Sequence, residues 1–526
     1  MKAKENTIDR VVQEGQIDYY VPFCFWAEDE CDIICKKIYD GFTNNIRDHS
    51  EYVKQAVHQT LEETGLFAIK TPRNYSLLNK FLPPRKDQKT DKTQDATASI
   101  SGTNVTLSPT DNGLQIGVIP GQAIAYNERL QKLINEEARI KEVYGDTYFN
   151  NHTRIVLPPF HVTLFNNKSD WLNAVLYVFK NKMAILKLEL PIKNVSFSLL
   201  QHSDTEHLIK EISSPWGVEF TYEASIIDSV WKAYLDKINE FGNFTKYRVN
   251  HYLRNTILTL FDDQPKHIQT ASDELLFDLY QIVSAPVQVI EEKRPYLIKK
   301  GKDYLDYHYY GDGGIRYYFN TAGDCLTIID DTAREYLYKQ LLAEDEDIDD
   351  RALNYYLVSS GYLNVEFSLI IFMLKTLNGS SAFNEKALDQ GNYTSLQKQY
   401  NTNRIFIAHL QEGCYGSVSE QVNLIEKCMR FYRKKDIEME KATALDQIIL
   451  EQKSQQNEIY QKRTTALGIV ITLIVGLPSI VESLSILRSW IPFLPEDIPI
   501  LTTEIVGGAL WLALGLILLF WVKKKR

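Results

Sequence analysis

The chain has 526 residues, enough for two or three domains, and its composition is globular, with 44% hydrophobic and 24% charged residues. A formal net charge of −10 argues against binding to a DNA or RNA duplex, because phosphate contacts require an excess of lysine and arginine. A small nucleotide bound in a local pocket is compatible with this charge.

The N-terminal region, residues 1–82, reads as mixed α/β. Its first residues lack the apolar stretch that a secretory signal peptide would show, so no such signal is predicted. The stretch "IDYYVPFCFW", beginning at residue 17, is β-branched and aromatic, which predicts a strand, and "ECDIICKKIYDGFTNNIR" has the apolar spacing of a helix. Residues 83–113 carry almost no bulky apolar side chain, so they predict a disordered insert.

Three of the six cysteines, Cys24, Cys31 and Cys35, are close in the sequence. Three thiols without a nearby fourth Cys or His form an incomplete zinc pattern. Packing on one element is the favoured interpretation, and a metal site is the alternative.

Residues 114–416 predict a cytoplasmic α/β domain. The apolar pattern predicts mainly strands over 155–200, with one helix at 170–182. It predicts helices over 225–285 and strands again over 303–330. Neither a Walker loop nor a Rossmann fingerprint is evident in the sequence, and no convincing Ser/His/Asp or Cys/His constellation stands out, so an enzyme is not predicted.

The densest aromatic run is "DYLDYHYYGDGGIRYYFN", residues 303–320, whose "GDGG" predicts a hairpin turn. Aromatic faces beside an arginine suit a nucleobase and its phosphate. The alternative is a hairpin stabilised by cross-strand aromatic pairs. The candidate ligand contacts are Tyr307, His308, Tyr309, Tyr310, Arg316, Tyr317 and Tyr318.

Two polar clusters could bind cations. One combines His202, Asp204, Glu206 and His207, and the other is the acidic run 343–351. A polar loop and a solvated loop are the favoured interpretations of these clusters.

Residues 417–463 contain no proline and predict a long stalk helix with a coiled-coil-like apolar seam. A basic belt on it, together with the basic C-terminal tail 523–526, forms a candidate collar that would hold anions or repel cations. A solvated helix face is the plainer interpretation of the belt. The collar consists of Arg430, Arg433, Lys434, Lys435, Lys523, Lys524, Lys525 and Arg526.

Uncharged runs at 464–481 and 505–522 predict two transmembrane helices, 464–489 and 504–522, joined by an extracytoplasmic loop at 490–503. Basic residues flank both outer ends, so the positive-inside rule predicts a multi-pass inner-membrane protein of a bacterium with both termini in the cytoplasm.

Small and polar residues share one face of the first predicted span. Close helix packing through small residues is one interpretation, and a pore lined by a homo-oligomer is the other. The candidate pore-lining residues are Thr465, Gly468, Thr472, Gly476, Ser479, Glu482 and Ser483.

This layout resembles the CorA family of metal-ion transporters, in which a cytoplasmic α/β domain precedes a long stalk helix, two spans and a basic C-terminus. The resemblance rests on residues 417–526, on "ITLIVGLPSIV" around Pro478 and on the final "KKKR". It implies an α+β domain followed by a stalk and two C-terminal transmembrane helices, in a homo-oligomer that would be a pentamer.

The Gly-Met-Asn signature of the family is missing, and its place reads "ESLSILRSW". A branch without that motif is the CorA-like membrane effector of type III CRISPR antiviral defence, and the chain resembles it. The resemblance implies a channel effector gated by a nucleotide messenger, S-adenosylmethionine conjugated to AMP, with no tightly bound cofactor. The alternatives are a magnesium transporter with an altered filter, which would bind Mg²⁺, and a membrane-anchored enzyme or binding module.

Overall fold

The structure is a computed structural model that describes residues 9–47, part of 125–136, 152–201, 208–215, 226–284, 294–307, 309–311, 314–320, 324–344, 365–380, 393–414, 416–429, 431–490 and 500–524. The chain forms two compact units. The first comprises Met1–Asp389 and Lys398–Glu438, and the second comprises Gln390–Gln397 and Met439–Arg526.

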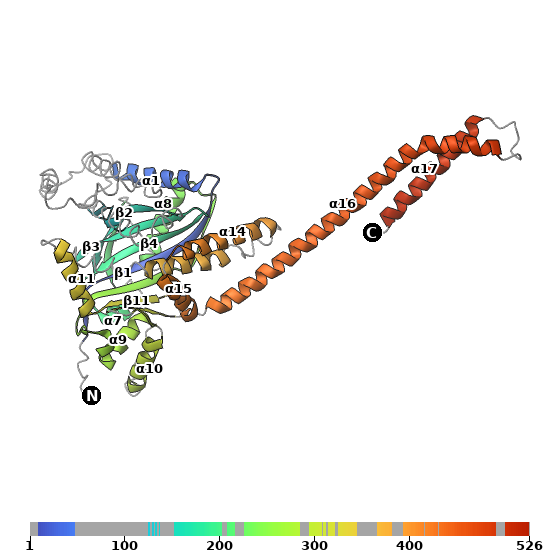
Figure 1. The fold of residues 1–526 in the computed structure, drawn as a ribbon. Coiled ribbons are helices and arrows are strands. Elements are labelled where there is room, and N and C mark those ends of the chain that lie inside the picture. The colour runs from blue at the N-terminus through green and yellow to red at the C-terminus, as the bar shows by residue number, and fades with distance from the viewer. Residues whose placement is uncertain are drawn as a thin grey trace, which may run out of the picture. The chain divides into compact units, whose positions relative to one another are not determined.

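The first unit is built on one 11-stranded sheet (Figure 1). The strands run in the order β6-β2-β3-β4-β1-β8-β11-β10-β9, and β5 and β7 also pair with β1. Their bounds are β1 Val11–Trp26, β2 His152–Leu164, β3 Ser169–Phe179, β4 Met183–Ile192, β5 Val195–Ser196, β6 Ile209–Ser213, β7 Lys246–Val249, β8 Leu253–Phe261, β9 Tyr309–Tyr310, β10 Ile315–Phe319 and β11 Asp324–Ile329.

Strand β1 lies near the middle of the sheet and fixes the position of the candidate site. It pairs antiparallel with β4 on one side and with β8 on the other. In this register Asp18 is opposite Glu189 on β4 and opposite Asn255 on β8. Among the described pairs, β8 with β11 is the parallel one.

One face of the sheet is covered by α1, α8 and α9. The odd-numbered side chains of β1, such as Tyr19 and Val21, point to this face because successive residues of a strand alternate between faces. The helices of this unit and of the C-terminal region are α1 Cys31–Arg47, α7 Phe197–Gln201, α8 Ile226–Gly242, α9 Asp273–Val283, α10 Arg294–Tyr307, α11 Asp331–Glu344, α14 Tyr393–Glu412, α15 Gly416–Cys428, α16 Phe431–Trp490 and α17 Ile500–Lys524.

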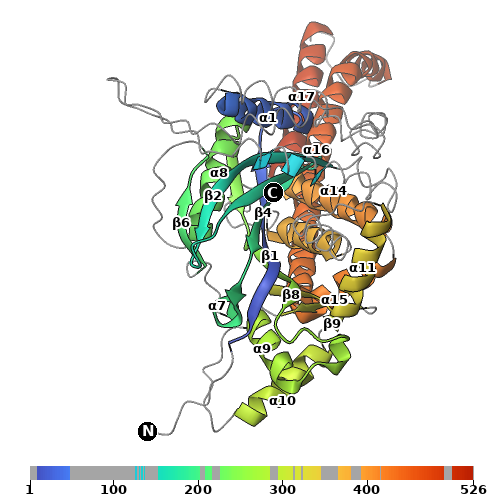
Figure 2. The ribbon, with the colours of Figure 1, turned by 90° about the vertical axis from the view of Figure 1, so that its left-hand side faces the viewer.

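The opposite face is covered by helix 365–380, α15 and part of α14. Apolar residues of these helices, including Phe367, Ile407 and Val422, pack with Tyr20 and Cys24 of β1. Figure 2 shows α8 and α15 on opposite sides of the sheet. The sheet therefore has two separate cores, one on each face.

The predicted strands at 17–26 and within 155–200 and the predicted helix at 30–47 are confirmed as β1, β2–β4 and α1. The helix predicted at 170–182 is wrong, because Ser169–Phe179 is the strand β3. This strand lies between β2 and β4 and is buried on both faces, so its apolar residues do not alternate with polar ones. The prediction for 225–285 found α8 and α9 but missed β7 and β8.

The continuous stalk predicted from residue 417 is interrupted. Helix α15 ends at Cys428, and α16 begins at Phe431 and runs for 60 residues to Trp490. Pro478 lies inside α16.

The prediction of two transmembrane helices is corrected. Over the described residues, no helix combines the length and the apolar character needed to cross a membrane. The spans had been predicted from the uncharged runs 464–481 and 505–522, whose length suits the hydrocarbon core. The fold class with two spans, the channel and the multi-pass membrane localisation are therefore not supported, while the mixture of strands and helices before residue 417 is observed.

Candidate functional site

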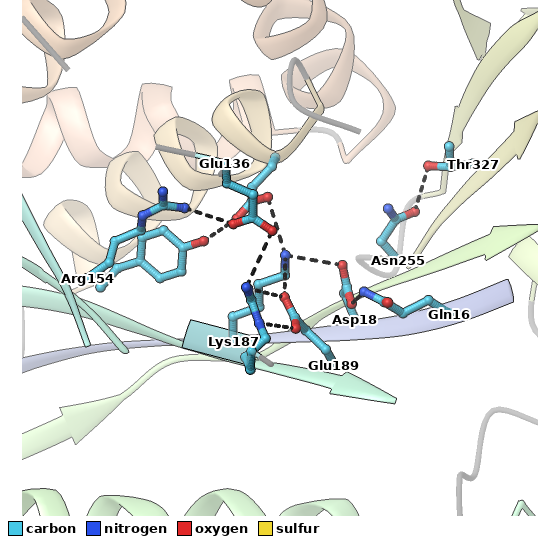
Figure 3. A network of polar contacts seen from close by, with 11 residues as sticks. Gln16, Asp18, Glu136, Arg154, Lys187, Glu189, Asn255 and Thr327 are labelled. Atoms are coloured by element: carbon cyan, nitrogen blue, oxygen red, sulfur yellow. Dashed lines mark hydrogen bonds and ion pairs between the residues drawn. The ribbon is translucent and has the colours of Figure 1, made fainter. Parts of the chain in front are cut away.

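The most unusual feature of the sheet is a set of charged side chains inside the core beneath helix 365–380 (Figure 3). We call it the buried ion network. Asp18 is completely buried, and Lys187 and Arg129 are 3% and 2% exposed. The network consists of Asp18, Arg129, Glu136, Arg154, Lys187, Glu189 and Glu366, with Tyr177 hydrogen-bonded to it.

Lys187 stands at the centre of the network. Its Nζ lies 3.0 Å from Glu189 Oε1, 3.3 Å from Glu366 Oε2 and 3.5 Å from Asp18 Oδ2. The same ammonium lies 5.7 Å from the centre of the Tyr20 ring. The three carboxylates converge on a position suited to a cation, and the protein's own lysine fills that position.

The second half of the network consists of two arginines, Arg129 and Arg154, that both pair with Glu136. Arg129 binds Glu189 through two nitrogen atoms, with Nε 2.7 Å from Oε2 and Nη2 2.8 Å from Oε1. The Nη2 contact is a charge-assisted hydrogen bond, and the Nε contact is a close ion pair. Arg129 also lies 3.4 Å from Glu136, which Arg154 contacts at 3.3 Å.

Strand alternation explains why these charges meet. Lys187 and Glu189 are two residues apart on β4, so both point to the same face, and the register places Tyr20 and Asp18 opposite them. The intervening Leu188 and its alternating neighbours Leu186 and Leu190 belong to the core of the other face. One strand therefore supplies apolar side chains to one core and charged side chains to the other.

The electrostatic consequences differ between the acids. Burial opposes ionisation of Glu189, but Arg129 and Lys187 outweigh it and lower its pKa to about 2. Burial similarly opposes ionisation of Glu136, and Arg129 and Arg154 hold its pKa below the ordinary value. These two carboxylates are therefore ionised at neutral pH.

Asp18 behaves in the opposite way. Burial raises its pKa to about 7 and, although Lys187 acts to lower it, the nearby charges of Glu189 and Glu366 act with burial. Burial would also discharge Lys187, but its three carboxylate neighbours raise the pKa of the ammonium well above the usual value. Within the network, Asp18 is thus the acid whose pKa lies near neutral pH.

Helix 365–380 connects the network to α15 and to the start of α16. At its first turn, Glu366 accepts a hydrogen bond from Tyr177 and pairs with Lys187. Further along, Ser368 Oγ donates to Gln421 Oε1 at 2.7 Å, and Lys375 Nζ pairs with Glu426 Oε1 at 2.7 Å. The sheet and α15 are thus held by polar contacts to the same helix.

An aromatic contact extends this connection to α16. The rings of Phe372 and Phe431 meet edge to face with their centroids 5.4 Å apart. Phe431 is the first residue of α16 and is buried in the same core as Ile425 and Cys428 of α15. A displacement of helix 365–380 would therefore disturb the base of α16.

The predicted hairpin is confirmed, since Tyr317 and Tyr318 of β10 pair with Tyr310 and Tyr309 of β9. Tyr317 and Tyr318 alternate between the two faces of the sheet, as expected for a strand, and each is buried in the core of its face. Tyr307 belongs to α10 rather than to a strand, and His308 lies outside the described residues.

The remaining members of that predicted ligand site lie at the edge of the sheet. Tyr310 is half-buried, and its hydroxyl lies 3.1 Å from Glu420 Oε2 of α15. Arg316 is half-buried on β10. The hairpin therefore contributes to packing and to a second contact with α15.

The predicted pore-lining residues lie on α16, in the second unit. The hydroxyl of Thr472 donates to Gly468 O at 2.8 Å, and that of Ser483 donates to Ser479 O in the same way. Both hydroxyls are therefore hydrogen-bonded to the backbone of α16 itself. Gly476 faces Trp511 of α17, whose Nε1 donates to Leu473 O at 3.0 Å. Thr465 and Glu482 are exposed. Gly476 therefore lies at the contact between α16 and α17.

Most other predicted sites lie outside the description. His202, Asp204, Glu206 and His207, the insert 83–113, residues 345–351 of the acidic run, Arg430, Lys525 and Arg526 are outside the described residues. Lys435 is exposed on α16, while Arg433 and Lys434 of α16 and Lys523 and Lys524 of α17 are placed by their backbone.

The three cysteines that are close in the sequence are divided between the two cores of the sheet. Cys24 is buried on one face of the sheet, and Cys31 and Cys35 belong to the core of the other. Burial raises the pKa of Cys24 to about 11 and that of Cys35 to about 12. Where the structure describes the chain, no group of three or more His, Cys, Asp and Glu side chains is placed to hold a metal.

The sequence analysis missed the buried ion network. A usable signal was present, because Lys187 interrupts the apolar run "AILKLELPI" and Asp18 interrupts "IDYYV". A charge in the middle of a buried strand requires a partner. Such interruptions predict a buried ion pair, but not which distant residues complete it.

Comparison with known proteins gives no assignment, since no family model, no curated protein and no solved structure matches the chain.

Proposed function

We propose that this protein is a nucleotide-responsive signalling effector in which the first unit binds a small nucleotide and controls the base of helix α16. The observation that supports this proposal is the path of contacts through helix 365–380. It joins Lys187 of the sheet to Glu426 of α15 by one ion pair at each end, 3.3 Å and 2.7 Å long.

A ligand shifts such a system only by binding its two arrangements with different affinity. The sheet and helix 365–380 would form the sensing part, and α15 with the start of α16 the responding part. The resemblance seen in the sequence supplies the ligand class, the S-adenosylmethionine–AMP conjugate, and the context, type III CRISPR defence. The proposed activity is regulated binding and not catalysis.

We further propose that the effector works as a homo-oligomer assembled through its second unit. Large apolar side chains of α16 and α17 are exposed in the single chain, among them Ile474 at 67%, Val475 at 68% and Ile517 at 68%. Extended exposed apolar surface is typical of an interaction site. Additional copies of this chain would cover it.

Calorimetric titration of the full-length protein with the conjugate, cyclic oligoadenylates and ATP tests ligand binding. Amide hydrogen exchange of residues 416–428, with and without the bound compound, tests the response of α15. We expect one nucleotide to bind and to change the exchange of α15 at least several-fold. Binding of none of the three, or binding that leaves α15 unchanged, contradicts the proposal.

Two variants separate binding from response. Glu366→Gln weakens the link between helix 365–380 and Lys187, so the exchange response of α15 should shrink while a nucleotide still binds. Lys302→Met removes a different lysine–carboxylate pair, with Asp273 at 2.8 Å on the surface, and serves as the matched control. The control should respond like the unmodified protein.

A further inference from the structure

We infer that the buried ion network is a charge-operated latch, in which a single proton at Asp18 decides how firmly helix 365–380 is held against the sheet. This inference concerns the chain without any nucleotide, so it stands or falls independently of the proposed ligand.

The first observation is the charge count of the network. Its acids are Asp18, Glu136, Glu189 and Glu366, and its cations are Arg129, Arg154 and Lys187. Counted over these seven described side chains with every group ionised, the network has one negative charge in excess. With a proton on Asp18, the four acids and three bases balance. Excess charge is costly in a core that water does not reach.

The second observation is which groups surround Asp18. Gln16 Nε2 of the same strand donates to it at 2.6 Å, and on β4 it faces Lys187 and Glu189. On β8 its register neighbour is the neutral Asn255, whose Oδ1 accepts a hydrogen bond from Thr327 of β11. The charge of Glu366, on helix 365–380, also acts on Asp18.

The third observation is where the excess charge would act. Asp18 and Glu189 belong to adjacent strands tied by backbone pairing, whereas Glu366 belongs to a helix held by side-chain contacts. When Asp18 ionises, three carboxylates compete for the single ammonium of Lys187. Glu366 is the carboxylate that can move away, and it carries helix 365–380 with it.

The sign of the pH dependence follows from these groups. The pKa of Asp18 is raised from 3.8 to about 7 in the folded chain, so its contribution to stability is complete below 3.8 and is lost as the pH rises through 7. Glu189, with a pKa of about 2, stays ionised throughout this range, and Lys187 stays charged. The latch should therefore be closed near pH 5.5 and loosened near pH 8.

Hydrogen exchange of helix 365–380 at pH 5.5 and pH 8, corrected for the intrinsic exchange rate at each pH, tests the inference on the full chain. We expect the opening equilibrium of this helix to increase at least about tenfold at pH 8, since one unit of pKa corresponds to a factor of ten. An equal opening equilibrium at the two pH values overturns the latch.

Variants identify the responsible group. Asp18→Asn is permanently neutral, and Glu366→Gln removes the carboxylate that would be repelled, so each should reduce the tenfold change to less than about twofold. Glu426→Gln breaks the Lys375 pair outside the network and should loosen the helix equally at both pH values.

His152 is a second side chain to test as the source of the pH response, since it lies beside the network. Its ring is 6.0 Å from that of Tyr177, which is hydrogen-bonded to Glu366, and 5.3 Å from that of Phe179. His152→Gln should keep the full pH response. A response that survives in Asp18→Asn but disappears in His152→Gln assigns the titration to the histidine and overturns the proposal.

Discussion

The two faces of the central sheet solve the problem of burial in different ways. On the face covered by α1, α8 and α9, the core is a continuous set of apolar side chains such as Ile34, Val230 and Leu279. On the face covered by helix 365–380, apolar side chains surround seven charged groups. The same strands β1 and β4 contribute to both cores.

The difference teaches where stability and response reside. An apolar core is non-directional and tolerates changes of shape as long as volume is conserved. A buried ion network is directional, and removal of one member leaves its partners uncompensated. The apolar face is thus suited to hold the fold, while the charged face is suited to specify the position of a helix that must respond.

The largest effect is expected from Lys187→Met. This change leaves Asp18, Glu189 and Glu366 without their common cation, so we expect a loss of about 3–5 kcal/mol in the free energy of unfolding, measured by urea denaturation. Adding Asp18→Asn to this variant should restore part of the loss, because it removes one uncompensated charge. A loss below about 1 kcal/mol for the single variant would show that the network does not hold charge as described.

A smaller effect is expected from Ile238→Ala in α8, on the apolar face. Ile238 is completely buried, and its truncation should cost about 3 kcal/mol through lost burial and the cavity left behind. The loss, measured in the same denaturation experiment, should be the same at pH 5.5 and pH 8. A loss that depends on pH would contradict the division of roles between the two faces.

Glu426→Gln should be milder again. Its partner Lys375 is 25% exposed and can turn toward water, so we expect a loss of about 1–2 kcal/mol. Limited proteolysis should show faster cleavage near α15 in this variant, while cleavage in the strands should stay unchanged. Faster cleavage spread evenly over the chain would mean that the pair supports the whole fold.

The smallest effect is expected from Lys302→Met on the surface of α10. The pair with Asp273 is exposed on both sides, and salt and water weaken it. Thermal unfolding should occur at the same temperature as in the unmodified protein. A clear decrease would show that surface pairs contribute as much as the buried ones.

Much of the first unit was readable from the sequence. The β-branched and aromatic residues of "IDYYVPFCFW" predicted β1, and "GDGG" predicted the β9–β10 hairpin, because both signals are local. The assignment failed at β3, whose two buried faces erase the alternation that distinguishes a half-exposed strand. The two predicted spans are corrected as well, because no helix over the described residues is long and apolar enough to cross a membrane.

The buried ion network could not be predicted as a unit. Arg129, Lys187 and Glu366 are separated by 58 or more residues in the chain, and no spacing rule relates them. The tertiary fold alone brings them together. In the aromatic hairpin, the strand pattern predicted that Tyr317 and Tyr318 alternate between faces, but only the tertiary fold shows that both are buried in cores.

A double-mutant cycle tests most directly the claim that helix 365–380 couples the sheet to α15. Tyr177→Phe removes the hydrogen bond from Tyr177 to Glu366 and leaves that from Lys187, and Glu426→Gln removes the ion pair to α15. The opening free energy of α15 would be measured by hydrogen exchange in both single variants and in the double variant. Coupling predicts an interaction energy above about 0.5 kcal/mol, whereas additive effects would show that the two ends of the helix act independently.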